Sequence, residues 1–483
     1  HSLNVYGYYS HDRFAFNSNE KYGYNNLNAS ARWRAVFNEK LIGYFSAGYD
    51  HYDYNNRETV NASAAYKLSF DINQYFVKAD FTNILADKHT LNFGFKSMLY
   101  HINSGTYEPE GSESFVKKDV LQKDKALETA FYLGDEWEIT PKLSVNAGIR
   151  YSLFSALGPR SYYQYASDML PHESTITDTI TAGAGKFMKT YHGPEFRLSA
   201  RYAFTDNFSV KAGFNSMRQY IHKLSNTVIM SPTDTWKLSD VNIKPQRGWQ
   251  AAAGLYLNSP SGIWEYSVEG YYKRMSDYLD YRGGAKLLMN HHIETDVINT
   301  QGHAYGVELQ VKKQVGKLNG WMSYTYSRTF LRQNDKRIEK PVNNGDWYPT
   351  EYDKPHDFKF VGNYKFTHRY SMSINVDYST GRPTTIPAGQ YYDESTQSMR
   401  VYYTERNSYR IPDYFRTDIS FNIEPSHHLT LLTHSSISIG VYNVTGRKNV
   451  YSIYYMPEEG QIKGYQMSIF GVPIPFITYN IKF

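Results

Sequence analysis

Several stretches of this sequence place a charged residue at every second position, between apolar ones, and these charges are the first candidates for chemistry. Six of them stand in the clearest stretches: Arg150, Arg197, Arg201, Lys211, Glu265 and Glu269. No nucleophile-elbow pattern, HExxH motif or phosphate-binding glycine loop accompanies them. We therefore expect neither an enzyme nor a bound cofactor. Three interpretations stay open for the six charges: they hold another domain of the protein, guide a polar ligand, or face a wet interior.

Histidine and acidic clusters could bind metal, and three stretches qualify: the pair His291 and His292, the pair His427 and His428, and the run from Asp50 to Asp53. Neighbouring side chains on a strand point to opposite faces, so adjacent residues rarely reach one ion. Cysteine is absent, which removes thiolate sites and disulfides. We expect no metal site. The net charge of +5 is also too small to favour nucleic acid as a partner.

Aromatic residues are abundant, with 47 Tyr, 26 Phe and 7 Trp. A ring with a polar tip can stack on a ligand, and it also suits loop packing and membrane-interface belts. The loop candidates for contact with a ligand or a partner are Tyr163, Tyr220, Asp234, Trp236, Tyr391 and Tyr392. For Asp234 and Trp236 the alternative is that they fix the fold of their own loop beside Pro232.

The element that must position these residues is a β-strand, because the charges alternate with apolar residues at period two. Between Lys142 and Phe154, one face carries Leu143, Val145, Ala147, Ile149, Tyr151 and Leu153, and the other carries Arg150 with small polar residues. Similar alternation predicts 18 strands, at 2–14, 23–37, 40–54, 70–84, 88–103, 127–139, 142–154, 192–205, 207–218, 247–258, 262–276, 303–315, 319–332, 353–367, 369–380, 412–424, 434–443 and 475–483.

The connections between these strands alternate in length. Tight turns at Asn38 with Glu39, Ala86 with Asp87, Thr140 with Pro141, and Asp206 interleave with long polar segments. The mean hydropathy is −0.60 and no run approaches the roughly 18 apolar residues of a membrane-spanning helix. Short turns on one rim and long loops on the other are typical of outer-membrane barrels. The alternative is a soluble β-protein, which rarely needs so many long strands or such one-sided loops.

Several segments resemble the barrel of TonB-dependent outer-membrane transporters. They are ETAFYLGDEWEITPKLSVNAGIRYSLF from Glu128, HAYGVELQVKKQVGKLNGWMSYTYSRT from His303, YDKPHDFKFVGNYKF from Tyr352, STGRP from Ser379, RIPDYFRTDIS from Arg410 and VYNVTGRKNVYS from Val441, with a last strand that ends at Phe483. The segment from Arg218 to Gln246 resembles a subset of this family that carries an extra N-terminal domain and works with a surface lipoprotein.

The resemblance implies an all-β fold, a transmembrane antiparallel β-barrel in the outer membrane of a Gram-negative bacterium. Plugged transporters of this kind have about 22 strands, so we expect residues 1–483 to be the C-terminal part of a longer protein whose plug and first strands lie upstream. The implied function is import of a scarce nutrient, such as a siderophore, a cobalamin-like molecule, an oligosaccharide or a peptide. The implied partners are outer-membrane lipids, the energy-transducing protein TonB through an upstream segment, and a surface lipoprotein.

Two other functions stay open. One is a barrel that serves as a scaffold or assembly component for surface lipoproteins without transport. The other is a passive porin, which is disfavoured because a lumen of about 22 strands is too open without a plug.

Overall fold

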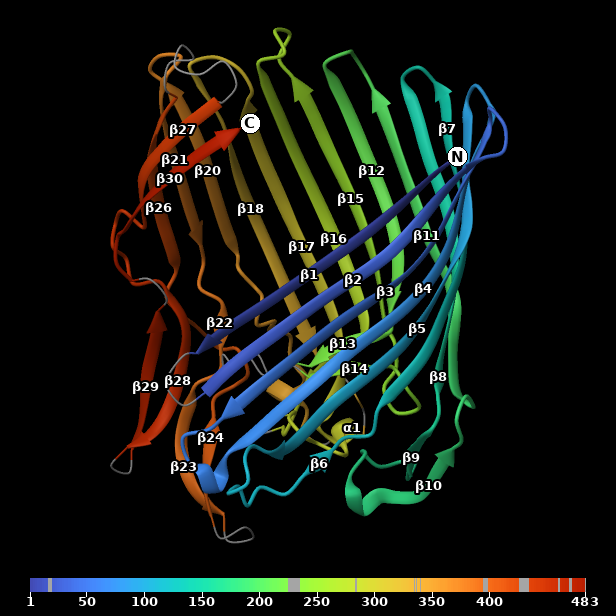
Figure 1. Ribbon diagram of the computed structural model, residues 1–483, viewed down its shortest axis with the longest axis vertical. Helices are drawn as coiled ribbons and strands as arrows, with labels where there is room; N and C mark the ends of the chain where they lie inside the picture. Colours follow the sequence, from blue (N-terminus) through green and yellow to red (C-terminus); the bar gives the residue numbers. More distant parts are fainter. Residues whose placement is uncertain are drawn as a thin grey trace.

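The computed structural model describes residues 1–15, 20–224, 235–282, 285–333, 335, 337–338, 340–393, 398–424, 434–458, 461–468 and 471–482. One antiparallel sheet of 20 strands dominates it, and two of these, β6 (Asp119–Val120) and β19 (Tyr348–Pro349), are two-residue additions. The predicted 18 long strands are therefore confirmed in the described chain, where each strand pairs with the next long strand along the sequence (Figure 1).

The long strands have these bounds: β1 (Ser2–Ala15), β2 (Glu20–Val36), β3 (Leu41–Glu58), β4 (Tyr66–Ala86), β5 (His89–Pro109), β7 (Asp124–Thr140), β8 (Leu143–Leu157), β11 (Phe187–Ala203), β12 (Phe208–Gln219), β15 (Gln246–Asn258), β16 (Trp264–Tyr281), β17 (Val297–Lys313), β18 (Leu318–Arg332), β20 (His356–Lys365), β21 (Tyr370–Ser379), β26 (Tyr414–Ile423), β27 (His434–Tyr442) and β30 (Ile474–Lys482).

The two faces of the sheet differ as the alternation predicts. On β8, Ile149 and Tyr151 are 43% and 40% exposed, whereas Phe154 on the other face is fully buried. The register carries this split across the sheet, since Ile149 pairs with the exposed Phe196 of β11, and Arg150 pairs with the buried Glu195. A soluble protein would not leave such a continuous apolar face in water, so the outer face is the lipid-facing one.

Short turns connect the strands at one rim, at the top of Figure 1, and the long loops lie at the other rim. A threonine hydroxyl organises three of the turns in the same way. The Oγ1 atoms of Thr140, Thr205 and Thr367 accept the amide N–H three residues on, at 3.0, 3.0 and 3.2 Å. These side chains satisfy amides that the ladder leaves open, which confirms the predicted tight turns at Thr140 and near Asp206.

The long loops contain small sheets of their own. They are the hairpins β9 (Arg160–Tyr165) with β10 (Ile176–Ala182), β13 (Ile221–Leu224) with β14 (Thr235–Leu238), β22 (Pro383–Thr384) with β25 (Tyr409–Arg410), β23 (Pro387–Asp393) with β24 (Ser398–Tyr403), and β28 (Val450–Glu458) with β29 (Gln461–Ser468). The helical pieces are η1 (Ala62–Ala64), η2 (Glu173–Thr175), α1 (Ile293–Asp296) and η3 (Val342–Gly345). In the described chain, helices as short as these fall well below the length of a membrane span.

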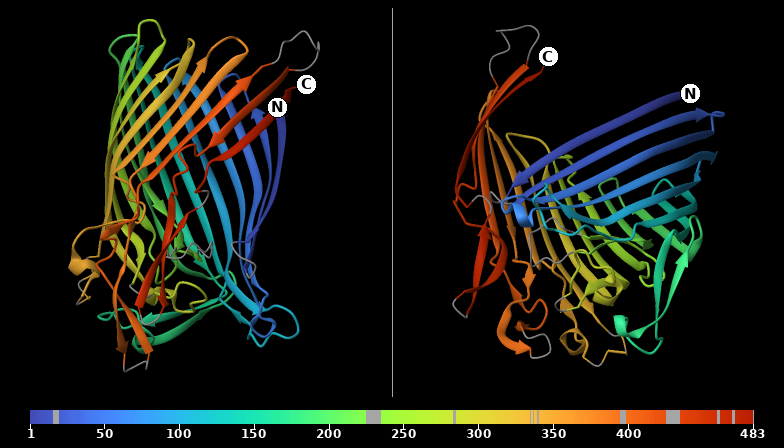
Figure 2. Two further views of the ribbon diagram at one scale, coloured as in Figure 1. Left: turned by 90° about the vertical axis from the view of Figure 1, so that its left-hand side faces the viewer. Right: turned by 60° about the horizontal axis from the view of Figure 1, so that its bottom comes forward.

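The first and last strands each have one neighbour among the described residues. β1 pairs with β2, and β30 pairs with β27. Figure 2 shows the edges of these two strands apart from each other, so the sheet curves around a lumen without a β1–β30 ladder. The expected upstream strands and plug remain a prediction.

Candidate functional site

A hairpin from the long loop between β12 and β15 folds back into the barrel. β13 and β14 lie inside the ring of strands rather than beyond its rim (Figure 1). The backbone carbonyl of Trp236 accepts a hydrogen bond from Ser104 Oγ at the end of β5, at 3.2 Å. The hairpin thus crosses the lumen on the side of the long loops.

Apolar contacts fix the hairpin to the inner wall. Leu238 and Tyr220 are buried in one cluster with Ile72, Tyr100, Ile102, Ala126 and Phe154, which project inward from β4, β5, β7 and β8. The rings of Tyr220 and Phe154 stack with centroids 4.6 Å apart and an interplanar angle of 4°. The Tyr220 hydroxyl lies 2.7 Å from the hydroxyl of Ser152. Burial of this apolar surface, which contributes about 25 cal/mol per Å², helps to hold the hairpin inside.

Four buried charges connect the same hairpin to the wall. Lys237 Nζ lies 2.9 Å from Asp124 Oδ2 on β7 and 2.8 Å from Asp240 Oδ2. Arg160 of β9 bonds Asp124 and lies 3.6 Å from Asp240. Two acids and two bases compensate each other, so the group carries no net charge. Burial alone would raise the pKa of Asp240, but Lys237 and Arg160 outweigh it and lower that pKa to about 2.

His222 sits next to this group and is 3% exposed. Its Nε2 lies 2.9 Å from the hydroxyl of Ser239. Burial, with the nearby charge of Lys237, lowers the pKa of His222 to about 4. The imidazole is therefore neutral at neutral pH, and it is the one group of this cluster that a mild acid can charge.

Tyrosines and an arginine line the space among the long loops, which we call the vestibule. Arg406 Nη1 lies 2.7 Å from Asp280 Oδ2, and Tyr348 donates its hydroxyl to the same oxygen at 2.5 Å. These groups border a small cavity of about 60 Å³ that Tyr278, Tyr281 and Lys223 also line. Phenolic rings and both signs of charge meet here, which is the chemistry that a polar, aromatic ligand requires.

Arg150 faces the lumen, and two carboxylates bind its guanidinium. Its guanidinium lies 3.1 Å from Glu128 on β7 and 3.1 Å from Glu195 on β11. Ser152 donates a hydrogen bond to Glu195 at 2.8 Å. Arg150 therefore joins three adjacent strands and supports the stack of Tyr220 on Phe154.

The other charged candidates lie nearer to the short turns. Arg201 and Lys211 are register partners on β11 and β12, and both are exposed to the lumen. Glu269 accepts a hydrogen bond from Tyr256 at 2.7 Å, and Lys211 lies over the same ring at 4.3 Å. Glu265 pairs with Lys312 at 3.3 Å. Arg197 is exposed too. The structure does not bring these residues together with Arg150.

The structure places the aromatic loop candidates in different surroundings. The ring of Tyr163 contacts that of His292 in a tilted arrangement, with ring centroids 4.6 Å apart. Trp236 is half-buried against the inner wall. Tyr391 and Tyr392 are 50% and 58% exposed on the hairpin β23–β24. Asp234 lies outside the described residues.

The candidate metal ligands point apart where the structure describes them. His291 Nε2 lies 2.9 Å from Asp119, whereas His292 contacts Tyr163. His51 bonds Asp53 on the outer face, whereas Asp50 bonds Asn28 on the lumen face. His427 and His428 lie outside the described residues.

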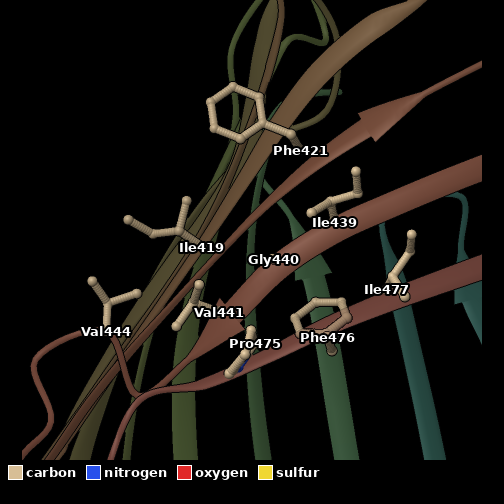
Figure 3. Close-up of a pocket in the computed structure, with 9 residues that line it drawn as sticks. All are labelled: Ile419, Phe421, Ile439, Gly440, Val441, Val444, Pro475, Phe476 and Ile477. Carbon is tan, nitrogen blue, oxygen red and sulfur yellow. The ribbon is translucent and has the colours of Figure 1, made fainter.

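A groove of about 610 Å³ lies on the lipid-facing surface of β26, β27 and β30 (Figure 3). Its walls are apolar side chains, among them Ile419, Phe421, Ile439 and Ile477, and the ring of Phe476 lies against Gly440. No polar group of the lining faces it in a way that would orient a nutrient, so it belongs to the surface that contacts acyl chains.

Sequence reasoning missed Lys237, Asp240, Asp124 and His222. For Lys237 and Asp240 the one available signal was their position near Trp236, whereas Asp124 and His222 stand elsewhere in the sequence. A buried ion pair leaves no local pattern in a loop.

Residues 2–444 match the family model described as "TonB dependent receptor-like, beta-barrel". Among solved structures, the chain is similar to the ferric-catecholate import receptor from E. coli, with 12% identity and a TM-score of 0.60, over 96% of this chain and 65% of that one. It is also similar to the pyoverdine outer membrane receptor from Pseudomonas aeruginosa, with 12% identity and a TM-score of 0.59, over 95% of this chain and 62% of that one.

A third structure is the ferric yersiniabactin uptake receptor from Yersinia pestis, with 14% identity and a TM-score of 0.59, over 96% of this chain and 62% of that one. This chain thus spans a little under two thirds of the length of the solved chains that it matches. No curated protein matches it. At these identities the structures establish the fold, and the family model establishes the relationship. The chain belongs to the TonB-dependent receptor-like β-barrels of the Gram-negative outer membrane.

Proposed function

We propose that the protein imports a scarce nutrient across the outer membrane with energy from the inner membrane, through TonB. The observation that carries this proposal is the division of the lumen. On the side of the long loops, the hairpin β13–β14 and its buried ions form a floor beneath a vestibule with aromatic and charged walls. Nearer the short turns, the wall is exposed and charged, at Arg201 and Lys211 for example.

A vestibule of this kind suits a ligand that combines rings with charge. Tyr278 and Tyr281 offer ring faces, and Arg406 and Lys223 offer positive charge. Siderophores, cobalamin-like molecules, oligosaccharides and peptides all meet this description in part. The structural relatives are named for ferric catecholate, pyoverdine and ferric yersiniabactin, so an iron-loaded siderophore is the first ligand to test.

The exposed charges of the wall near the short turns fit a role in holding a plug. A plug surface with acids opposite Arg197, Arg201 and Lys211 would be stabilised by many weak ion pairs, each worth up to about 1 kcal/mol. Such contacts hold a domain in place and still allow it to move when energy is applied.

The test is uptake by cells that carry the full-length gene, its deletion, or the variant Arg406→Ala. We expect uptake of one radiolabelled ferric siderophore to require the gene, to stop with a protonophore, and to fall about tenfold or more in the variant, because loss of a buried charge contact costs 1.4 kcal/mol or more. Arg201→Ala is the matched control and should leave ligand affinity unchanged.

A scaffold for a surface lipoprotein is the second proposal, favoured by the exposed rings of Tyr391, Tyr392, Tyr402 and Tyr403 on one hairpin. Deletion of β23–β24 would then abolish capture of a lipoprotein. If deletion of the gene leaves uptake of each candidate nutrient unchanged while the intact protein captures a lipoprotein, the import proposal fails.

A further inference from the structure

The outer face of the barrel carries two arginines around one tryptophan at the rim of the long loops. The guanidinium carbon of Arg332 lies 4.8 Å from the ring centroid of Trp347, and that of Arg274 lies 5.7 Å from it. Arg332 ends β18, Arg274 lies on β16, and Trp347 comes from the loop that follows β18. We call these three residues the arginine–tryptophan site.

The site faces the lipid side of the wall rather than the lumen. Arg274 is the register partner of His303, and His303 pairs with Phe330 and contacts Trp347 edge-on, with centroids 4.3 Å apart. The neighbouring residues Met275 and Leu331 are buried on the lumen face. Side chains alternate along a strand, so Arg274 and Arg332 project outward.

Neither arginine has an acidic partner among the described residues. Arg274 donates one hydrogen bond, to Gln301 at 2.9 Å, and the Nε of Arg332 is buried with no hydrogen-bond partner there. Two nearby arginines differ, because Arg247 pairs with Asp277 at 2.8 Å and Arg328 pairs with Asp353 at 3.3 Å. The arginine–tryptophan site thus holds two positive charges that the described protein leaves uncompensated.

The position of the site along the membrane normal follows from strand β17. The outward residues between His303 and Lys313 are all apolar or aromatic: Tyr305, Val307, Leu309 and Val311. Ten residues of strand tilted by about 40° rise about 25 Å, the height of the apolar band of a barrel. Lys313, over Trp264 at 5.8 Å, marks one boundary of this band, and the arginine–tryptophan site marks the opposite one.

We propose that the arginine–tryptophan site binds a phosphate group of a lipid in the leaflet that faces the cell exterior. Arginines at the middle of the apolar band would cost about 2–4 kcal/mol each, whereas at its boundary the cost is near zero and lipid phosphates lie within reach. A planar guanidinium forms two parallel hydrogen bonds with phosphate oxygens, and the ring of Trp347 holds both groups in place. On the outer face of β3 and β4, the residues near the long loops are instead Asp53, His51 and Asp71.

Purified full-length protein in neutral detergent tests the proposal, with dioleoyl phosphatidic acid as the probe and native mass spectrometry as the readout. Dioleoylglycerol has the same chains without the phosphate and should not be retained. We expect the double variant R274Q/R332Q to retain at most about one tenth of the phosphatidic acid that the parent protein retains. K313Q removes a cation above a tryptophan at the opposite boundary and should bind as the parent does.

Heat-modifiable migration in gels reports whether each variant is a folded barrel. If the double variant does not fold, R274Q and R332Q singly carry the test, each with an expected loss of about threefold. Equal retention by the parent and the folded arginine variants would overturn the proposal. So would an equal loss in K313Q, or displacement of the lipid by the same concentration of inorganic phosphate, which would make the site one for free anions.

Discussion

Lys237 and Lys211 both lie inside the barrel, but one is buried and the other is exposed. The side chain of Lys237 is 4% exposed between two carboxylates, and Lys211 is exposed beside the ring of Tyr256. The comparison shows that charged residues inside this barrel have two roles. On the long-loop side, buried and compensated charges fix the hairpin β13–β14, whereas nearer the short turns exposed charges are open to a binding partner.

The largest expected effect comes from Lys237→Ala, because it leaves Asp124 and Asp240 buried beside a single arginine. Removal of one member of a buried ion pair costs about 3–5 kcal/mol. We expect the amides of β13 and β14 to lose that much protection in hydrogen exchange.

The matched variant is Lys211→Ala, which removes an exposed lysine and should change barrel stability in urea by less than about 0.5 kcal/mol. If both variants had the same small effect, the contrast between the long-loop side and the short-turn side of the lumen would be wrong.

The next effect is a pH dependence of hairpin docking. The pKa of His222 is about 4 in the folded structure and 6.5 ordinarily. Between these values the undocked hairpin binds more protons, so docking is fully favourable above about pH 6.5 and weakens as the pH falls toward 4. From pH 7 to pH 5 the loss is about 2 kcal/mol. Lys237, with a pKa of about 8, and Asp240, with one of about 2, hardly titrate in this window.

The chain contains no cysteine, so a single spin label at Lys223→Cys can report docking. Its mobile fraction should rise between pH 7 and pH 5. With His222→Asn added, the mobile fraction should no longer change with pH. A rise that persists without His222 would assign the titration to another group.

A smaller effect on hairpin docking is expected for Tyr220→Phe, which keeps the stack on Phe154 and removes one hydroxyl. The hydrogen bond between Tyr220 and Ser152 is worth about 1 kcal/mol, and Ser152 still has Glu195 as a partner. Hydrogen exchange of β14 should rise by about fivefold. A loss as large as that in Lys237→Ala would mean that this wall contact, rather than the buried ions, dominates docking.

Much of the fold could be predicted because each strand must present one face to lipid. The alternation from Lys142 to Phe154 gave β8 almost to its ends, Leu143 and Leu157. Some strand ends near the long loops were predicted slightly too long, as at β20, which begins at His356 rather than 353. Others were predicted too short, as at β17, which begins at Val297 rather than 303. There the strand has left the lipid, so its outward residues, such as Asn299 and Gln301, are polar and the alternation fades.

The candidate site could be predicted only in part. Arg150 was recognised as a lumen residue because its strand alternates, but its partners Glu128 and Glu195 stand on other strands. Lys237 and Asp124 are 113 residues apart in the sequence. Their pairing depends on how a loop folds back into the barrel, and no periodicity records that.

The hairpins β23–β24 and β28–β29 each form a separate two-stranded sheet, with no ladder to the barrel among the described residues. Their hydrogen bonds close on themselves, so a change of sequence there leaves the register of the wall intact. These hairpins lie at the rim of the long loops. The architecture therefore lets the sequence of this rim change while the wall beneath it stays the same.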